Sequence, residues 1–210
     1  MFESQHHLPL GQLRDVAYHE AGHIVVAEHH GQLAREVRAV ASDPGALRSS
    51  YFACASLTWQ QRAERILAGD LAARRLLGLS THRITLPHTP AALARAGTSL
   101  PALRFTCPVD AKNHDGMRVV EGADRVAGGQ WLAWIGDRVD AVDRILADRW
   151  TCVELLASKL EAEMRRAPQA TTRDHMLLGC AEILEASGRH PRFVACMRCF
   201  ASRFFERRET

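Results

Sequence analysis

The pentapeptide His-Glu-Ala-Gly-His at residues 19–23 is the part of this 210-residue chain whose residue types and spacing point most directly to chemistry. Histidines four positions apart lie on one face of an α-helix, so His19 and His23 can bind a single metal ion. Glu20 follows the first histidine and is well placed to accept a proton from a metal-bound water. This pattern predicts zinc-dependent hydrolysis of peptide bonds.

The sequence around the motif predicts a buried helix from about Leu13 to His30 that ends at Gly31. Apolar residues surround the two histidines and Glu20. Burying the polar groups of these three side chains without partners would cost several kcal/mol by order of magnitude. A bound metal explains their presence more simply than an amphipathic surface helix does. Gly22 supports the same reading, since a mid-helix glycine costs about 1 kcal/mol relative to alanine and implies a close neighbour.

A catalytic zinc normally takes three protein ligands and leaves one position for water. The third ligand must therefore come from outside the first helix. Spacing alone does not choose among the acidic and histidine candidates, which are Glu64, Asp70, Asp110, His114, Asp115 and Glu121.

The composition, 47% hydrophobic and 24% charged, is that of one compact domain. We expect a single domain over residues 1–210, with a core at about 13–165 and a C-terminal helical extension at about 170–210. Apolar stretches fall short of the roughly 20 residues that a membrane helix needs, and the N-terminus lacks an export signal. These features predict a cytoplasmic protein with no membrane association.

The cysteines and the basic residues are less informative. The six cysteines lack the density of a disulfide scaffold, and the pair Cys196/Cys199 has no second pair to complete a zinc site. Arginines and phenylalanines are interspersed from Arg189 to Arg208, and this segment could bind nucleic acid or form an amphipathic docking helix. No nucleic-acid motif accompanies this charge, so the docking helix is favoured and nucleic acid is not an expected partner.

The fold class predicted is mainly α, with a small β-hairpin beside the metal helix. The hairpin strands are expected at Glu36–Ala41 and Ser50–Ala55, and their free edge could hold an extended peptide. A helix is expected from Thr58 to Leu77, interrupted at Gly69 and ended by Gly78. The Pro-containing stretch from Leu79 to Pro108 reads as a long loop that could serve as a lid.

Helices are expected to resume near Asp115 and to continue from Gln130 to Ile145. A final helical pair is expected over Thr172–Ala186 and the arginine-rich tail. One apolar stripe at helical spacing reads as core; its members are Val142, Leu146, Trp150, Val153, Ala157, Leu160 and Met164.

Several segments, in order, resemble the peptidase domain of the FtsH-type ATP-dependent zinc metalloproteases. VAYHEAGHIVVA is similar to that family's zinc helix, and ILAGDLAARRLLG to its glycine-led helix. VRAVASDPGALRSSYF falls where the family has a strand and turn. NHDGMRVVEGADRV resembles the segment with the family's aspartate ligand, and VDRILADRWTCVELLASKLEAE its C-terminal helices. Together these segments cover most of residues 13–165.

The resemblance implies a zincin-like peptidase domain with zinc held by His19, His23 and Asp115 and with Glu20 as general base. It favours Asp115 over Asp110 because the residues after Asp115 keep the family's helical spacing. Arg74 and Arg75 depart from it, since the family usually has acidic residues there. No Gly-Lys pair occurs in the chain, so we expect no phosphate-binding loop and no ATPase module.

The leading hypothesis is a stand-alone zinc metallopeptidase that acts on protein or peptide substrates, and an ATPase in trans could supply unfolded chains. A second is an ImmA-type peptidase that cleaves repressors, which a ligand at Glu64 would favour. A third is a non-catalytic regulatory or binding module with a structural zinc, for which Glu20 would have no use. Tyr51, His82 and His88 are candidates to assist the oxyanion. The oligomeric state and the substrate are left open by the sequence.

Overall fold

The computed structural model describes residues 10–40, 47–52, 57–79, 115–166 and 175–187. Helices dominate these ranges, and three short strands form one antiparallel sheet in the order β2-β1-β3. The elements are α1 (Leu10–His29), β1 (Ala34–Ala39), β2 (Leu47–Tyr51), α2 (Trp59–Leu76), α4 (Asp115–Ala127), the 3-10 turn η1 (Gly128–Gln130), α5 (Trp131–Asp148), α6 (Trp150–Arg166), β3 (His175–Gly179) and α7 (Cys180–Ala186). The mainly helical class with a small sheet beside the first helix is therefore confirmed.

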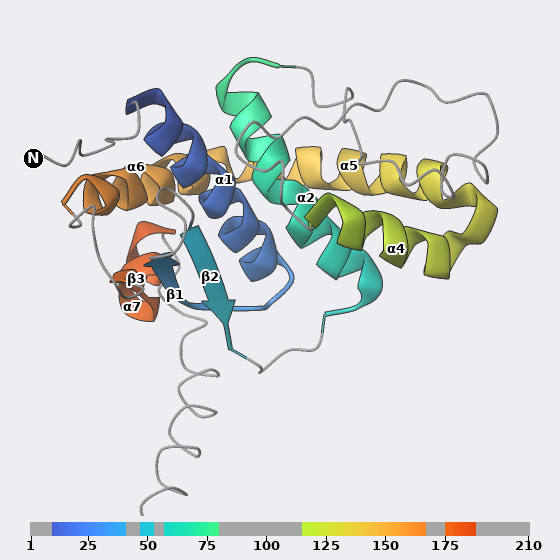
Figure 1. Ribbon diagram of the computed structural model, residues 1–210, viewed down its shortest axis with the longest axis horizontal. Helices are drawn as coiled ribbons and strands as arrows, with labels where there is room; N and C mark the ends of the chain where they lie inside the picture. Colours follow the sequence, from blue (N-terminus) through green and yellow to red (C-terminus); the bar gives the residue numbers. More distant parts are fainter. Residues whose placement is uncertain (1–9, 41–46, 53–56, 80–114, 167–174, 188–210) are drawn as a thin grey trace, which may run out of the picture.

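Helix α1 is the central element of the fold. It lies between the sheet and α2, and α6 and α5 run one after the other across α1 and α2 (Figure 1). Its apolar residues are buried on several sides, with Ala17, Ala21 and Ile24–Ala27 all inaccessible to solvent. The helix that carries the histidine motif is thus a core helix, as the sequence predicted.

Helices α1 and α2 approach each other closely at Gly22. A Cβ atom on Gly22 would lie 2.4 Å from the carbonyl oxygen of Ala68 and 2.7 Å from Cβ of Ala72. A side chain there would collide with the backbone of α2, which cannot move aside as a flexible side chain can. The close neighbour expected at this glycine is the α2 backbone.

Helix α2 begins with a capping box. The hydroxyl of Thr58 accepts a hydrogen bond from the backbone N–H of Gln61, and the Gln61 side chain accepts one from the N–H of Thr58. The helix runs without interruption through Gly69, so the predicted break there is wrong. It ends before Gly78, which adopts φ = +64° as a helix-terminating glycine.

The hairpin is confirmed, although its strands lie earlier than predicted. Strand β1 pairs with β2 from Ala34 opposite Tyr51 to Ala39 opposite Leu47, and the turn between them is outside the described residues. Strand β2 therefore ends at Tyr51, where the predicted second strand would have continued to Ala55. Glycine Gly31 adopts φ = +82° after α1, in agreement with the expected helix end.

The C-terminal part of the described chain differs from prediction. Residues 175–179, expected to be helical, form strand β3, which pairs with β1 from Glu36 opposite Gly179 to Ala39 opposite His175. A short apolar run of this kind suits either a strand or a helix, and only the partner strand decides between them. The helix expected over the second half of that segment is present as α7.

The long apolar stripe belongs to the core, but it spans two helices. Its aliphatic members from Val142 to Met164 are buried, and Trp150 packs against Tyr18 with ring centroids 5.7 Å apart. The helical conformation is interrupted at Arg149, between α5 and α6. None of the described helices combines the length and the apolar character needed to cross a lipid bilayer.

Candidate metal centre

His19 and His23 face each other on α1 as the motif predicted. Their Nε2 atoms are 3.0 Å apart, and the rings meet edge to face. Two nitrogens that each lie about 2.1 Å from one zinc ion in a tetrahedral site are separated by roughly 3.4 Å, a few tenths of an ångström more than the distance between these two atoms. The described geometry of the two imidazoles therefore fits two adjacent ligands of one metal.

The backbone of α2 sets the tautomer of His23. Nδ1 of His23 lies 2.7 Å from the carbonyl oxygen of Arg65, and since a carbonyl can only accept, Nδ1 carries the proton. In the neutral ring, Nε2 then has a free lone pair. A backbone carbonyl that orients the second ring nitrogen is a common feature of histidines that bind metals.

His19 is held in its neutral form. Desolvation, together with the neighbouring charge of His23, holds the pKa of His19 well below its usual value of 6.5. Its Nδ1 atom is buried without a hydrogen-bond partner among the described residues. A neutral imidazole is the form that binds a metal, so His19 does not have to lose a proton near neutral pH.

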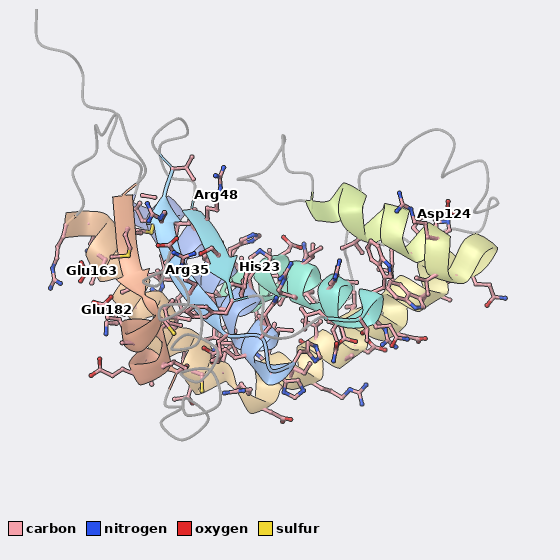
Figure 2. The ribbon with its side chains drawn as sticks, turned by 90° about the horizontal axis from the view of Figure 1, so that it is seen from below. His23, Arg35, Arg48, Asp124, Glu163 and Glu182 are labelled. Atoms are coloured by element: carbon pink, nitrogen blue, oxygen red, sulfur yellow. The ribbon has the colours of Figure 1, made fainter. Side chains whose placement is uncertain are left out.

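Gly69 of α2 packs directly against both imidazoles. A Cβ atom at this position would lie 2.4 Å from Nε2 of His23 and 2.8 Å from Nε2 of His19. Both contacts are far shorter than van der Waals separation. The absence of a side chain at Gly69 therefore leaves room for the two nitrogens to point toward a shared ligand, between β2 and α2 where Figure 2 shows His23.

Glu20 is buried on α1 and contacts the sheet. The hydroxyl of Ser49 on β2 donates a hydrogen bond to Oε1 of Glu20. This contact ties the carboxylate expected to act as general base to the middle of the edge strand. Within the described chain, the other edge of β2 pairs with no strand.

Asp70, a candidate third ligand, is buried next to this site. Its exposed fraction is 3%, and Oδ2 has no hydrogen-bond partner among the residues described. Burial raises the pKa of Asp70 from 3.8 to about 6, against smaller opposing effects of Arg74 and His23. The protonated form is thus favoured in the fold at mildly acidic pH.

The raised pKa predicts a pH-dependent stability effect. Because the folded protein holds a proton on Asp70 between about pH 4 and 6 that the unfolded chain releases, the free energy of unfolding falls as the pH rises from about 4 to about 6, and the loss is complete above that range. We expect Asp70→Asn to raise the free energy of unfolding of the metal-free protein by up to about 3 kcal/mol at pH 8, with no gain below pH 4. Urea unfolding of both proteins in chelator at several pH values measures the difference, and a gain that does not vary with pH would contradict the prediction.

Glu64 is engaged elsewhere. Its Oε2 atom lies 2.8 Å from Nε2 of His30, and its Oε1 atom lies 3.0 Å from Nη1 of Arg138. Glu64 therefore links α2 to the residue that follows α1 and to α5. It does not join the histidine pair, and no group of three potential metal ligands occurs among the described residues. A ligand at Glu64 was the feature that would have favoured an ImmA-type enzyme, and that support is lacking.

The remaining candidates lie partly or wholly outside the described residues. Asp115 is the first residue of α4, which packs against α2, but its side chain is not described, and the same is true of the Glu121 side chain. Several other predicted features lie beyond the described ranges: Asp110, His114, His82, His88, the Leu79–Pro108 loop apart from Leu79, the Cys196/Cys199 pair and the arginine-rich tail.

Tyr51, a candidate to assist the oxyanion, is described. It lies on β2, and the centre of its ring is 4.7 Å from the guanidinium carbon of Arg65.

Sequence reasoning missed two contributors to the site. Ser49 could have been noticed as a polar residue on the inner face of a strand, but only if the strand had been placed at 47–51. The Arg65 carbonyl is a backbone group, and no sequence signal marks it.

No protein-family model matches the chain, and a search of curated proteins gives no match either.

Proposed function

We propose that this protein is a zinc-dependent metallopeptidase that hydrolyses peptide bonds in protein substrates, with a zincin-like domain related to the FtsH-type peptidases. The observation that carries the proposal is the paired Nε2 atoms of His19 and His23, 3.0 Å apart with a buried Glu20 beside them. The Arg65 carbonyl and Gly69 provide the orientation and the space that such a pair of ligands needs.

Zinc fits the donor set, since neutral imidazoles and a carboxylate are its usual catalytic ligands. His19 and His23 would supply two ligands, and the third would come from Asp115 at the start of α4. A zinc ion held there would polarise the scissile carbonyl and increase the acidity of water.

Glu20 is the proposed general base. It accepts a proton from the attacking water and passes it to the leaving amine. The Ser49 hydroxyl keeps the carboxylate directed toward the side of α1 that faces β2. This contact argues for catalysis over a purely structural zinc, because a structural site has no need of an oriented base beside the metal.

Strand β2 is the proposed substrate platform. An extended peptide can add to a free sheet edge through backbone hydrogen bonds. Ser49 lies in the middle of β2 and contacts Glu20, so a peptide paired with β2 would pass close to the proposed base. The strand would then bind the substrate independently of much of its sequence.

The test is zinc content combined with peptide hydrolysis in variants of the third ligand. We expect one zinc per wild-type chain after reconstitution, loss of tight zinc binding in Asp115→Ala, and unchanged binding in Asp110→Ala. Elemental analysis after dialysis measures the metal, and circular dichroism checks that each variant is folded. A folded Asp115→Ala protein that binds zinc as tightly as wild type would show that the third ligand lies elsewhere, whereas wild-type protein without zinc-dependent hydrolysis would overturn the proposed function.

A further inference from the structure

The outer face of the hairpin, which points away from α1, carries an excess of positive charge. Residues alternate between the two faces along β2, and Ser49 contacts Glu20 on the inner side. Arg48 and Ser50 therefore point outward, opposite Arg38 and Glu36 of β1. The outer face thus has two arginines and one acidic residue, Glu36, and a third arginine, Arg35, is exposed at the register shift of β1.

Glu36 compensates one of these arginines. Its carboxylate lies 3.0 Å from Nη2 of Arg38 and also accepts a hydrogen bond from the Ser50 hydroxyl. The Arg38 contact is the main reason that the pKa of Glu36 lies below its ordinary value. The negative charge of this face is thus largely committed to Arg38.

Arg48 is the arginine nearest the free edge. It is exposed, its direct cross-strand neighbour is the like-charged Arg38, and no acidic side chain within the described ranges forms an ion pair with it. Figure 2 shows its side chain projecting from the strand away from the helices. Like charges directly opposite each other are unfavourable, so an acidic group beside Arg48 would relieve this repulsion.

We propose that the β2 edge selects extended peptide segments with an acidic residue opposite Arg48. This inference rests on the proposed function, because it assigns a charge preference to the same substrate platform. In an antiparallel peptide, the residue opposite Arg48 follows the residue opposite Ser49, so the acidic side chain lies one position from the segment nearest Glu20. Arg48 is thus a specificity-determining residue.

A peptide is a better occupant of this surface than a nucleic acid. The edge of β2 that pairs with no strand among the described residues offers backbone N–H and C=O groups in the spacing that another strand needs. The outward residues of β1 and β2 include no aromatic side chain on which a base could stack. The charge and the hydrogen-bonding edge together point to an acidic extended segment.

The experiment uses a neutral host peptide in which one glutamate is moved through successive positions, with glutamine and lysine versions as controls. Binding to the zinc-treated Glu20→Gln variant of the 210-residue chain is followed by fluorescence anisotropy, so that it is measured without cleavage. We expect glutamate to strengthen binding by about two- to fivefold, and only at alternate positions, because alternate residues of a strand lie on the same face of the sheet as Arg48 and a shift of the peptide by two residues brings each of them opposite it.

Two variants of Arg48 and one control variant test whether Arg48 is the cause of the preference. Arg48→Gln should remove the preference, Arg48→Glu should reverse it in favour of lysine, and Arg144→Gln, which changes an exposed arginine of α5, should leave it intact. A preference that is equal at every position, that persists in Arg48→Gln, or that is absent because neither peptide binds saturably would overturn the inference. An oligonucleotide that displaces the peptide in an Arg48-dependent way and binds more tightly would also overturn it.

Hydrolysis of the same peptides by the wild-type protein separates the two proposals. Cleavage without an Arg48-dependent preference would overturn the acidic preference and leave the peptidase function in place. Arg48-dependent binding without zinc-dependent cleavage would support the acidic-segment site and overturn the peptidase function.

Discussion

Replacement of Glu20 by glutamine should reduce kcat for peptide hydrolysis by about a hundredfold or more and leave the zinc content unchanged. Glutamine has nearly the same shape as glutamate and can still accept the Ser49 hydrogen bond through its side-chain carbonyl. It cannot accept a proton from water at neutral pH. The substitution therefore removes proton transfer and preserves the packing of a side chain that is only 7% exposed.

Glu163→Gln is the matched control, because it makes the same chemical change in α6, where Glu163 forms an ion pair with Arg166. We expect this control to keep wild-type kcat and KM. Rates are measured with a quenched fluorescent peptide at saturating concentration, and zinc by elemental analysis of the same samples. A Glu20→Gln protein that retains zinc and most of the wild-type kcat would show that Glu20 is not the base.

Gly69→Ala should abolish stoichiometric zinc binding and, with it, activity. The added methyl group would lie 2.4 Å from Nε2 of His23 and 2.8 Å from Nε2 of His19, so both imidazoles would have to leave their present positions. Helix α2 cannot withdraw easily, because Gly22 brings α1 against the Ala68 carbonyl one residue away. Displacement of the rings would also stretch the hydrogen bond from His23 to the Arg65 carbonyl.

The stability of this variant is expected to change less than its metal binding. Overpacking costs about 1–3 kcal/mol, and replacing a mid-helix glycine by alanine recovers about 1 kcal/mol. Gly136→Ala in α5 is the control, since a Cβ there meets no atom within 4 Å, and it should stabilise the protein and leave zinc binding unchanged. Wild-type zinc affinity in Gly69→Ala would contradict the described packing of α2 on the histidines.

Much of the site could be predicted from local sequence because its geometry is local. Positions 19 and 23 share a helix face whatever surrounds them, provided that the helix forms. The apolar residues around them place that helix in the core, and Gly31 and Gly78 mark helix ends through their positive φ angles. The pairing of two imidazoles and the choice of Glu20 follow from this helical spacing.

Contacts between residues far apart in the sequence explain why other predictions of secondary structure failed. The predicted break at Gly69 failed because packing of α1 on α2 outweighs the low helix propensity of one glycine. Residues 175–179 were expected to be helical, but pairing with β1 makes them a strand. The break at Arg149 likewise divides an apolar stripe whose period is continuous through the sequence.

By itself, therefore, the sequence determined the helix, the two histidines on one of its faces, the acidic residue beside them and the presence of a nearby hairpin. Only the tertiary structure decided that the Arg65 carbonyl orients His23, that Gly69 makes room for both rings and that Ser49 holds Glu20. These contacts join residues about 30 to 50 positions apart. Such contacts depend on how whole elements pack, and neither helical nor strand periodicity carries information over that separation.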